Sequence, residues 1–93
     1  MYEGKDRMTE LRLRHDGVAW KDVDGEVVAL DERAAVYLAA NPAGAVLWRS
    51  LALGATREEL AAELVREFGI DADRAVADTE VFLADLSGRG LLA

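Results

Sequence analysis

The sequence has no cysteine, a single histidine and a single proline among its 93 residues. The absence of cysteine excludes a disulfide framework and thiol chemistry, and it fits a reducing compartment. The first residues contain no apolar segment of the kind found in signal peptides. The uncharged run at residues 34–48 is too short to span a bilayer. We therefore expect a cytoplasmic protein without a membrane partner.

Residues suited to catalysis are scarce. His15 is expected in a solvated turn, and we do not expect Ser50 or Ser87 to lie within the distance of it that a catalytic triad requires. The glycines at residues 88–90 follow a predicted helix, whereas a phosphate-binding loop opens one. One histidine with scattered carboxylates is a weak basis for a metal site. We predict that the protein is not an enzyme and uses no cofactor or metal.

Positive charge is also scarce. The chain has 11 Lys and Arg against 18 Asp and Glu, and its formal net charge is −7. Nucleic-acid binders concentrate positive charge, because neutralisation of phosphates drives their affinity. Acidic residues outnumber basic ones again in residues 71–89, where the last helix is expected. We expect no nucleic-acid partner and a preference for a cationic or neutral one.

Apolar residues, in contrast, make up 52% of the chain and are ample for a core. The length corresponds to one domain. Residues 1–9 are polar and are predicted to form a flexible tail, and residues 10–93 are predicted to form a single domain. Leu11 and Leu13 alternate with arginines, which gives a short strand signal at the start of this domain.

Three strands are predicted in the first half of the domain. Residues 18–23 and 26–30 flank Asp24-Gly25, a strong signal for a two-residue hairpin, because both turn positions require positive φ. A third strand is predicted at residues 35–39. Short turns between consecutive strands indicate an antiparallel meander.

Three helices are predicted after the strands, and Leu91-Leu92 is expected to fold back onto the core. Strands segregated from helices indicate an α+β fold, winged helix-turn-helix-like, with an N-terminal three-stranded antiparallel sheet followed by three helices. The predicted N-caps are Asn41 before Pro42, Thr56 in a capping box with Glu59, and Asp71 or Asp73. The helices are predicted to end at Gly54, at Gly69, and at Gly88 and Gly90. The predicted buried stripes are Val46, Leu47, Ser50 and Leu51; Leu60, Leu64, Val65 and Phe68; and Val76, Thr79, Leu83 and Leu86.

The strand at residues 35–39, Ala-Val-Tyr-Leu-Ala, is last in the meander and is predicted at the edge of the sheet. Edge strands are usually protected by charge, proline or a bulge, and this one has none of these. Two interpretations follow: an extended peptide adds to the edge as a further strand, or the third helix covers it. Phe82 lies beside the main stripe of that helix, where it either lines a groove or belongs to the core.

Three segments of the sequence resemble the PqqD-like family, whose members are also called RiPP precursor peptide recognition elements. The segments are DGEVVALDERAAVYLAANPAG, GATREELAAELVREFG and FLADLSGRGLL, and the resemblance spans residues 11–92. The chain is most like the stand-alone leader-binding proteins of lasso peptide biosynthesis. It departs from the family pattern at Ala40, where leucine is frequent, and at Ala35, where a turn glycine is common.

The resemblance implies a function in natural product biosynthesis. The domain would bind the leader region of a ribosomally made precursor peptide by strand addition and present it to a separate leader peptidase or other peptide-modifying enzyme. Carried over by position, the hydrogen-bonding backbone would be that of Ala34, Ala35, Val36, Tyr37 and Leu38, and the cleft would be lined by Leu30, Val36, Tyr37, Ala75, Asp78, Thr79, Phe82 and Leu83.

Two rival functions remain open at the level of the sequence. In the first, the protein is an adaptor that docks on a modifying enzyme without binding peptide. In the second, which agrees less well with the acidic helices, it is a DNA-binding winged helix. We expect a monomer at low concentration, with a dimer formed through strand edges as the alternative.

Overall fold

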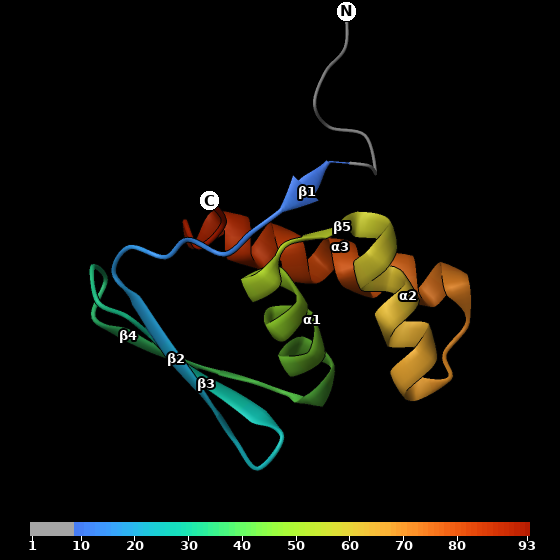
Figure 1. Ribbon diagram of the computed structural model, residues 1–93, viewed down its shortest axis with the longest axis horizontal. Helices are drawn as coiled ribbons and strands as arrows, with labels where there is room; N and C mark the ends of the chain where they lie inside the picture. The colour runs from blue at the N-terminus through green and yellow to red at the C-terminus, as the bar shows by residue number, and fades with distance from the viewer. Residues whose placement is uncertain (1–8) are drawn as a thin grey trace, which may run out of the picture.

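The computed structural model describes residues 9–93, so the predicted tail at residues 1–9 lies outside the described residues except for Thr9. An antiparallel three-stranded sheet and three helices form the predicted α+β fold, with α1 between the sheet and α2, and α3 crossing behind α1 and α2 (Figure 1). The elements are β1 (Glu10–Leu11), β2 (Val18–Val23), β3 (Glu26–Asp31), β4 (Val36–Ala40), α1 (Pro42–Leu53), β5 (Ala55–Thr56), α2 (Arg57–Phe68) and α3 (Ala72–Gly88).

The hairpin between β2 and β3 forms as its sequence predicts. Asp24 and Gly25 have φ angles of 53° and 83°, the pair of positive values that matches the twist of the flanking strands. The register runs from Val23 opposite Glu26 at the turn to Val18 opposite Asp31 at the far end.

The strand order β2-β3-β4 places β4 at one edge of the sheet, as predicted. The strand begins at Val36 and ends at Ala40, one residue later at each end than predicted. The reason is Ala35, whose φ of 57° belongs to the left-handed region and ends the turn instead of starting the strand. β4 pairs with β3 from Val36 opposite Asp31 to Ala40 opposite Val27.

All three helices start at predicted caps. The Asn41 side chain accepts a hydrogen bond of 2.8 Å from the Gly44 N–H, and Thr56 and Glu59 form the reciprocal capping box. Of the two candidates for α3, the cap is Asp71, which accepts from the Arg74 N–H at 2.8 Å.

The buried faces of the helices differ from the predicted stripes. Trp48 is buried in α1, where Val46 and Ser50 had been predicted. Ala75 is fully buried in α3, whereas the adjacent Val76 is 53% exposed. Hydrophobic spacing fixes the period of a stripe but not its rotation, and here small residues occupy the close contacts between helices. In α2 the buried residues are Leu60, Ala61 and Leu64, whereas the predicted Val65 and Phe68 are 38% and 43% exposed.

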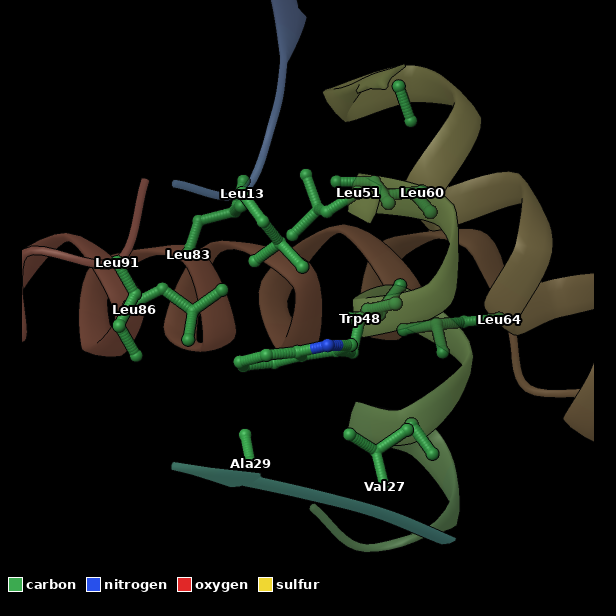
Figure 2. Close-up of a cluster of buried hydrophobic side chains, with 14 of the residues drawn as sticks. Leu13, Val27, Ala29, Trp48, Leu51, Leu60, Leu64, Leu83, Leu86 and Leu91 are labelled. Atoms are coloured by element: carbon green, nitrogen blue, oxygen red, sulfur yellow. The ribbon is translucent and has the colours of Figure 1, made fainter. Parts of the chain in front are cut away.

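The core lies between the sheet and the helices. The Trp48 ring extends from α1 over Val27 and Ala29 of β3, with the leucines of α2 and α3 on its other side (Figure 2). The C-terminal residues fold back as predicted, since Leu91 is buried and Leu92 forms an antiparallel bridge with Leu13. β1 pairs with β5 and holds the chain start against the α1–α2 connection. No helix within residues 9–93 has the length and apolar content needed to cross a membrane.

Candidate functional site

A groove lies beside the β4 edge. Its larger hollow, about 580 Å³, lies between α3 and the start of α1, and its smaller one, about 280 Å³, lies between α3 and β4. Phe82 and Asp85 line both hollows, so the two form one surface, which we call the β4–α3 groove. The other lining residues are Asn41, Ala43, Gly44, Leu47, Leu64, Arg74, Asp78 and Val81 in the larger hollow, and Tyr37, Leu38, Ala39, Ala40, Trp48, Leu86 and Arg89 in the smaller one.

Phe82 is seated against the first turn of α1. A Cβ built on the buried Gly44 would lie 3.3 Å from Phe82 Cε1, which is closer than ordinary van der Waals contact. Glycine at this position therefore lets the phenyl ring lie directly on the helix backbone. This contact with Gly44 holds Phe82 at the junction of the two hollows.

The β4 backbone presents hydrogen-bonding groups to the groove side. In a two-residue hairpin the residues that close the turn, here Val23 and Glu26, form a hydrogen-bonded pair, and such pairs alternate along the ladder. The N–H and C=O groups of Val27 and its alternate neighbours along β3 are then directed at β4. By the same alternation the N–H and C=O groups of Tyr37 and Ala39 are directed away from the sheet, at its open edge.

The side chains of β4 alternate between the two faces of the sheet. Leu38 and Ala40 share the face of the buried Val27 and Ala29, toward the helices, and both are partly buried. Tyr37 belongs to the opposite face and is 76% exposed.

Charge in the groove is mixed. Along α3, Arg74 lies 3.5 Å from Asp78, and Arg89 lies 3.2 Å from Asp85, both at i,i+4 spacing. All four side chains are largely exposed, so these ion pairs contribute little to stability and can be exchanged for contacts with a charged ligand. The groove can therefore hold an extended chain with apolar side chains and with charged side chains of either sign.

A buried carboxylate anchors the turn before β4. Asp31 Oδ1 accepts hydrogen bonds from Arg14 Nη2 at 3.0 Å and from the N–H groups of Arg33 and Ala34 at 3.1 and 3.4 Å. Burial by itself raises the pKa of Asp31, but the Ala34 N–H, the Arg14 charge and the other hydrogen bonds together lower it below its ordinary value. Asp31 is thus held ionised at neutral pH.

The structure brings together only some of the residues that the resemblance assigns to the hydrogen-bonding backbone and to the cleft. Tyr37, Leu38, Asp78 and Phe82 line the groove. The remaining ones lie elsewhere: Ala34 and Ala35 in the turn before β4, Val36 at the first position of β4, Leu30 on the face of the sheet away from the helices, and Ala75, Thr79 and Leu83 buried in the core.

Several groove residues were missed by the sequence analysis. Trp48, which is absent from the predicted stripe of α1, is buried in the core and also lines the smaller hollow. The sequence signal that would have located the larger hollow is Gly44, a glycine inside the first turn of a helix. Asp85 and Arg89 follow Phe82 at helical spacing and would have extended the same face of α3.

The described residues supply no obvious catalytic or metal centre. His15 is exposed in the turn before β2, and no group of three or more His, Asp or Glu within residues 9–93 is placed to hold a metal ion. Two buried side-chain atoms, Trp48 Nε1 and Thr79 Oγ1, have no hydrogen-bond partner among the described residues.

Comparison with known proteins identifies one family and two solved structures. The family described as Coenzyme PQQ synthesis protein D (PqqD) matches residues 26–92. The structure of TbiB1 in complex with the TbiA(beta) leader peptide is 27% identical in sequence, with a TM-score of 0.80 over 87% of this chain and 93% of that chain.

The second structure, a lasso peptide synthetase B1 complexed with the leader peptide, shares the fold. It is 24% identical, with a TM-score of 0.77 over 89% of this chain and 96% of that chain. No curated protein matches the chain.

Proposed function

This chain belongs to the PqqD family, and we propose that it is a non-catalytic recognition domain that binds the leader segment of a ribosomally synthesised precursor peptide. The observation that carries the proposal is the uncharged edge of β4 beside the β4–α3 groove. The similarity to TbiB1, which was solved in complex with a leader peptide, supports the same function.

We infer that the leader adds to β4 as a further antiparallel strand. The N–H and C=O groups of Tyr37 and Ala39 supply its hydrogen bonds, each worth about 0.5–1.5 kcal/mol net. Alternate leader side chains then point into the groove, toward Leu38 and Phe82 on either side. The backbone bonds give affinity without sequence preference, so the shape of the groove selects the leader.

The opposite face of the sheet is available to a processing enzyme. Val28 and Leu30 are half-buried there, Tyr37 is exposed, and a shallow hollow of about 220 Å³ lies among them. An exposed apolar face on so small a domain marks a protein contact. Tyr37 borders both this face and the groove, so an added leader strand would extend the face. We assign the face to the leader peptidase that the lasso-type resemblance implies.

The same apolar face favours a second candidate function, an adaptor that docks on an enzyme without binding peptide. A pull-down of the enzyme with and without precursor separates the two. Capture that depends on precursor supports leader presentation, and equal capture in both conditions supports the adaptor. Leu30→Lys is expected to reduce capture and leader cleavage while leaving leader affinity unchanged.

Leader binding itself is tested by anisotropy with a fluorescent synthetic peptide that carries the leader of the precursor encoded beside this protein. We expect saturation with a dissociation constant of about 1 μM or tighter. Absence of saturation at about 100 μM would contradict the proposal and leave the adaptor function.

Strand addition is tested by proline at the two edges of the sheet. Ala39→Pro removes an N–H that faces the groove side, and proline is tolerated at an edge strand when the lost N–H faces outward. Its matched control is Asp22→Pro, which removes an outward N–H at the β2 edge together with the exposed pair to Arg49. We expect Ala39→Pro to weaken leader binding and Asp22→Pro to leave it unchanged. Equal affinity in both folded variants would exclude addition at β4.

A further inference from the structure

We propose that Arg14 and Asp31 are positioning residues for the leader site, because together they fix the two walls of the β4–α3 groove relative to each other. The inference rests on the proposed function of that groove. We call Arg14 with its two partners, the Asp31 carboxylate and the Gly90 carbonyl, the Arg14 clasp.

A single guanidinium joins the two walls of the groove, which are the sheet edge at β4 and the helix α3. Arg14 Nη2 donates to Asp31 Oδ1 at 3.0 Å, and Asp31 is the last residue of β3, paired with Val36 at the start of β4. Arg14 Nη1 donates to the Gly90 carbonyl, two residues beyond the end of α3. Nε donates to the Asp16 carbonyl at 2.9 Å and fixes the plane of the group. The planar guanidinium holds its donors in one rigid plane and so fixes the three acceptors relative to one another, whereas the compact ammonium of lysine does not impose such a geometry.

The clasp also holds the turn from which β4 starts. Ala35 has a φ of 57°, a conformation that residues with a Cβ rarely adopt. Such a residue keeps its conformation only when its surroundings fix it. Asp31 accepts the N–H groups of Arg33 and Ala34, and the Glu32 N–H donates to the Gly17 carbonyl at 2.8 Å. Without Asp31, Ala35 is free to relax and the start of β4 moves with it.

The clasp lies at one end of the smaller hollow. Arg89, which precedes Gly90, and Tyr37, which follows Val36, both line that hollow. The side chains of Arg14 and Asp31 are 18% and 8% exposed, so water competes little for their contact. The width of the groove at this end is therefore set before the leader arrives, and a preformed site binds more tightly than one that must be ordered.

The first test measures affinity for the labelled leader peptide in Arg14→Gln and Asp31→Asn. Arg14→Gln is expected to weaken binding about fivefold or more, equivalent to about 1 kcal/mol. Asp31→Asn is expected to weaken it less, because the amide oxygen can still accept the Arg33 and Ala34 N–H groups. The matched control is Arg12→Gln, which removes a neighbouring arginine whose pair with Glu10 is exposed, and it is expected to change affinity less than about twofold.

A second measurement reports on the walls without any leader. The chain has no cysteine, so spin labels attach only at the introduced Glu32→Cys, in the turn, and Ser87→Cys, near the end of α3. Electron–electron distance measurements are expected to give a narrow distribution in the parent and in Arg12→Gln. In Arg14→Gln the distribution is expected to broaden or shift. If Arg14→Gln does not fold, Arg14→Lys is labelled at the same two sites.

The outcomes separate this inference from the proposed function. A parent protein that fails to bind leader refutes the function, whereas the distance measurement still tests the clasp. Folded Arg14 variants with parental affinity and a parental distance distribution overturn the positioning role and leave the function standing. Broadened distances with unchanged affinity overturn it as well, because the geometry of the walls would then not matter to the leader.

Discussion

Trp20 on β2 meets the buried Trp48 of α1 edge to face, with ring centroids 6.2 Å apart and 71° between the ring planes. Trp48 also lines the smaller hollow of the groove. Trp20 stands opposite Ala29 in the register and therefore shares the helix-facing side of the sheet, but it lies on β2, at the edge away from β4. The two tryptophans are the only ones in the chain, so one reports on the groove and the other on the β2 edge.

Trp48 is expected to report leader binding. In Trp20→Phe, Trp48 is the sole tryptophan. A leader that covers the smaller hollow should change the intensity or wavelength of Trp48 emission, because Trp48 lines that hollow. The change is expected to saturate with the dissociation constant obtained from anisotropy. A response in Trp48→Phe, with no response in Trp20→Phe, would place the bound peptide at the β2 edge of the sheet instead of in the groove.

Gly44→Ala is expected to reduce leader affinity while leaving the fold intact. Alanine inside a helix is favoured over glycine by about 0.5–1 kcal/mol, but the added methyl would lie 3.3 Å from Phe82 Cε1. The methyl would displace Phe82 into the groove and so lower leader affinity. In stability, this crowding opposes the gain from the helix preference of alanine, whereas in binding only the crowding acts. Thermal unfolding and the anisotropy titration measure them separately.

Gly88→Ala is the matched control for this prediction. Gly88 is the last residue of α3, and a Cβ there would meet nothing within 4 Å. The variant is expected to keep parental affinity. Parental affinity in Gly44→Ala would show that the seat of Phe82 does not shape the leader site.

Thr79→Val is expected to stabilise the protein. Thr79 is 2% exposed, and its Oγ1 has no hydrogen-bond partner within residues 9–93. Valine has nearly the same shape, and the removal of a buried hydroxyl without a partner should raise the free energy of unfolding by about 1 kcal/mol. Thr79→Ser, which keeps the hydroxyl and loses the methyl, should lower it. Urea denaturation measures the free energy of unfolding of both variants. A Thr79→Val variant less stable than the parent would mean that the hydroxyl is hydrogen-bonded in the folded protein.

Asp31 makes stability depend on pH at the acid end. Burial alone raises the pKa of Asp31. The Ala34 N–H, the Arg14 charge and the other hydrogen bonds together lower it by more, so the net shift is downward. A carboxylate with a lowered pKa contributes stability that is complete above its unfolded value of about 3.9 and is lost as pH falls through the folded value. The difference in unfolding free energy between the parent and Asp31→Asn should therefore shrink below about pH 4.

Urea denaturation at several pH values measures this difference. Asp16→Asn is the control, because Asp16 pairs with Arg33 at 2.8 Å but its side chain is 87% exposed. The Asp16 variant should show little difference from the parent at any pH. A constant difference for Asp31→Asn across the acid range would show that its carboxylate is not ionised preferentially in the folded state.

Local sequence signals predicted the order and ends of nearly all elements. The Asp24-Gly25 pair, the Asn41 and Thr56 caps and the terminal glycines each act through their own backbone or nearest neighbours, so no distant contact is needed to locate them. β4 starts and ends one residue later than predicted because here a distant contact is involved. Ala35 takes a conformation that its side chain disfavours, and the Asp31 carboxylate that bonds the turn before it is paired with Arg14, which is distant in sequence.

The groove was predicted only in part for a related reason. Of the cleft residues that the resemblance implies on α3, Phe82 and Asp78 line the groove, whereas Ala75 and Thr79 are buried. Their rotation depends on how α2 and α3 pack, which is decided by contacts across the core. Leu30 lies on the opposite face of the sheet because its position alternates with that of Ala29, which packs under Trp48.

The sequence alone determined the fold class, the helix caps, the hairpin and the uncharged edge of the sheet, because each depends on residue type and on short-range spacing. Tertiary structure decided which face of each helix is buried, that Phe82 sits on Gly44, and that Arg14 reaches both Asp31 and Gly90. These are contacts between residues far apart in the chain, and they form only when the three helices and the sheet pack together around Trp48.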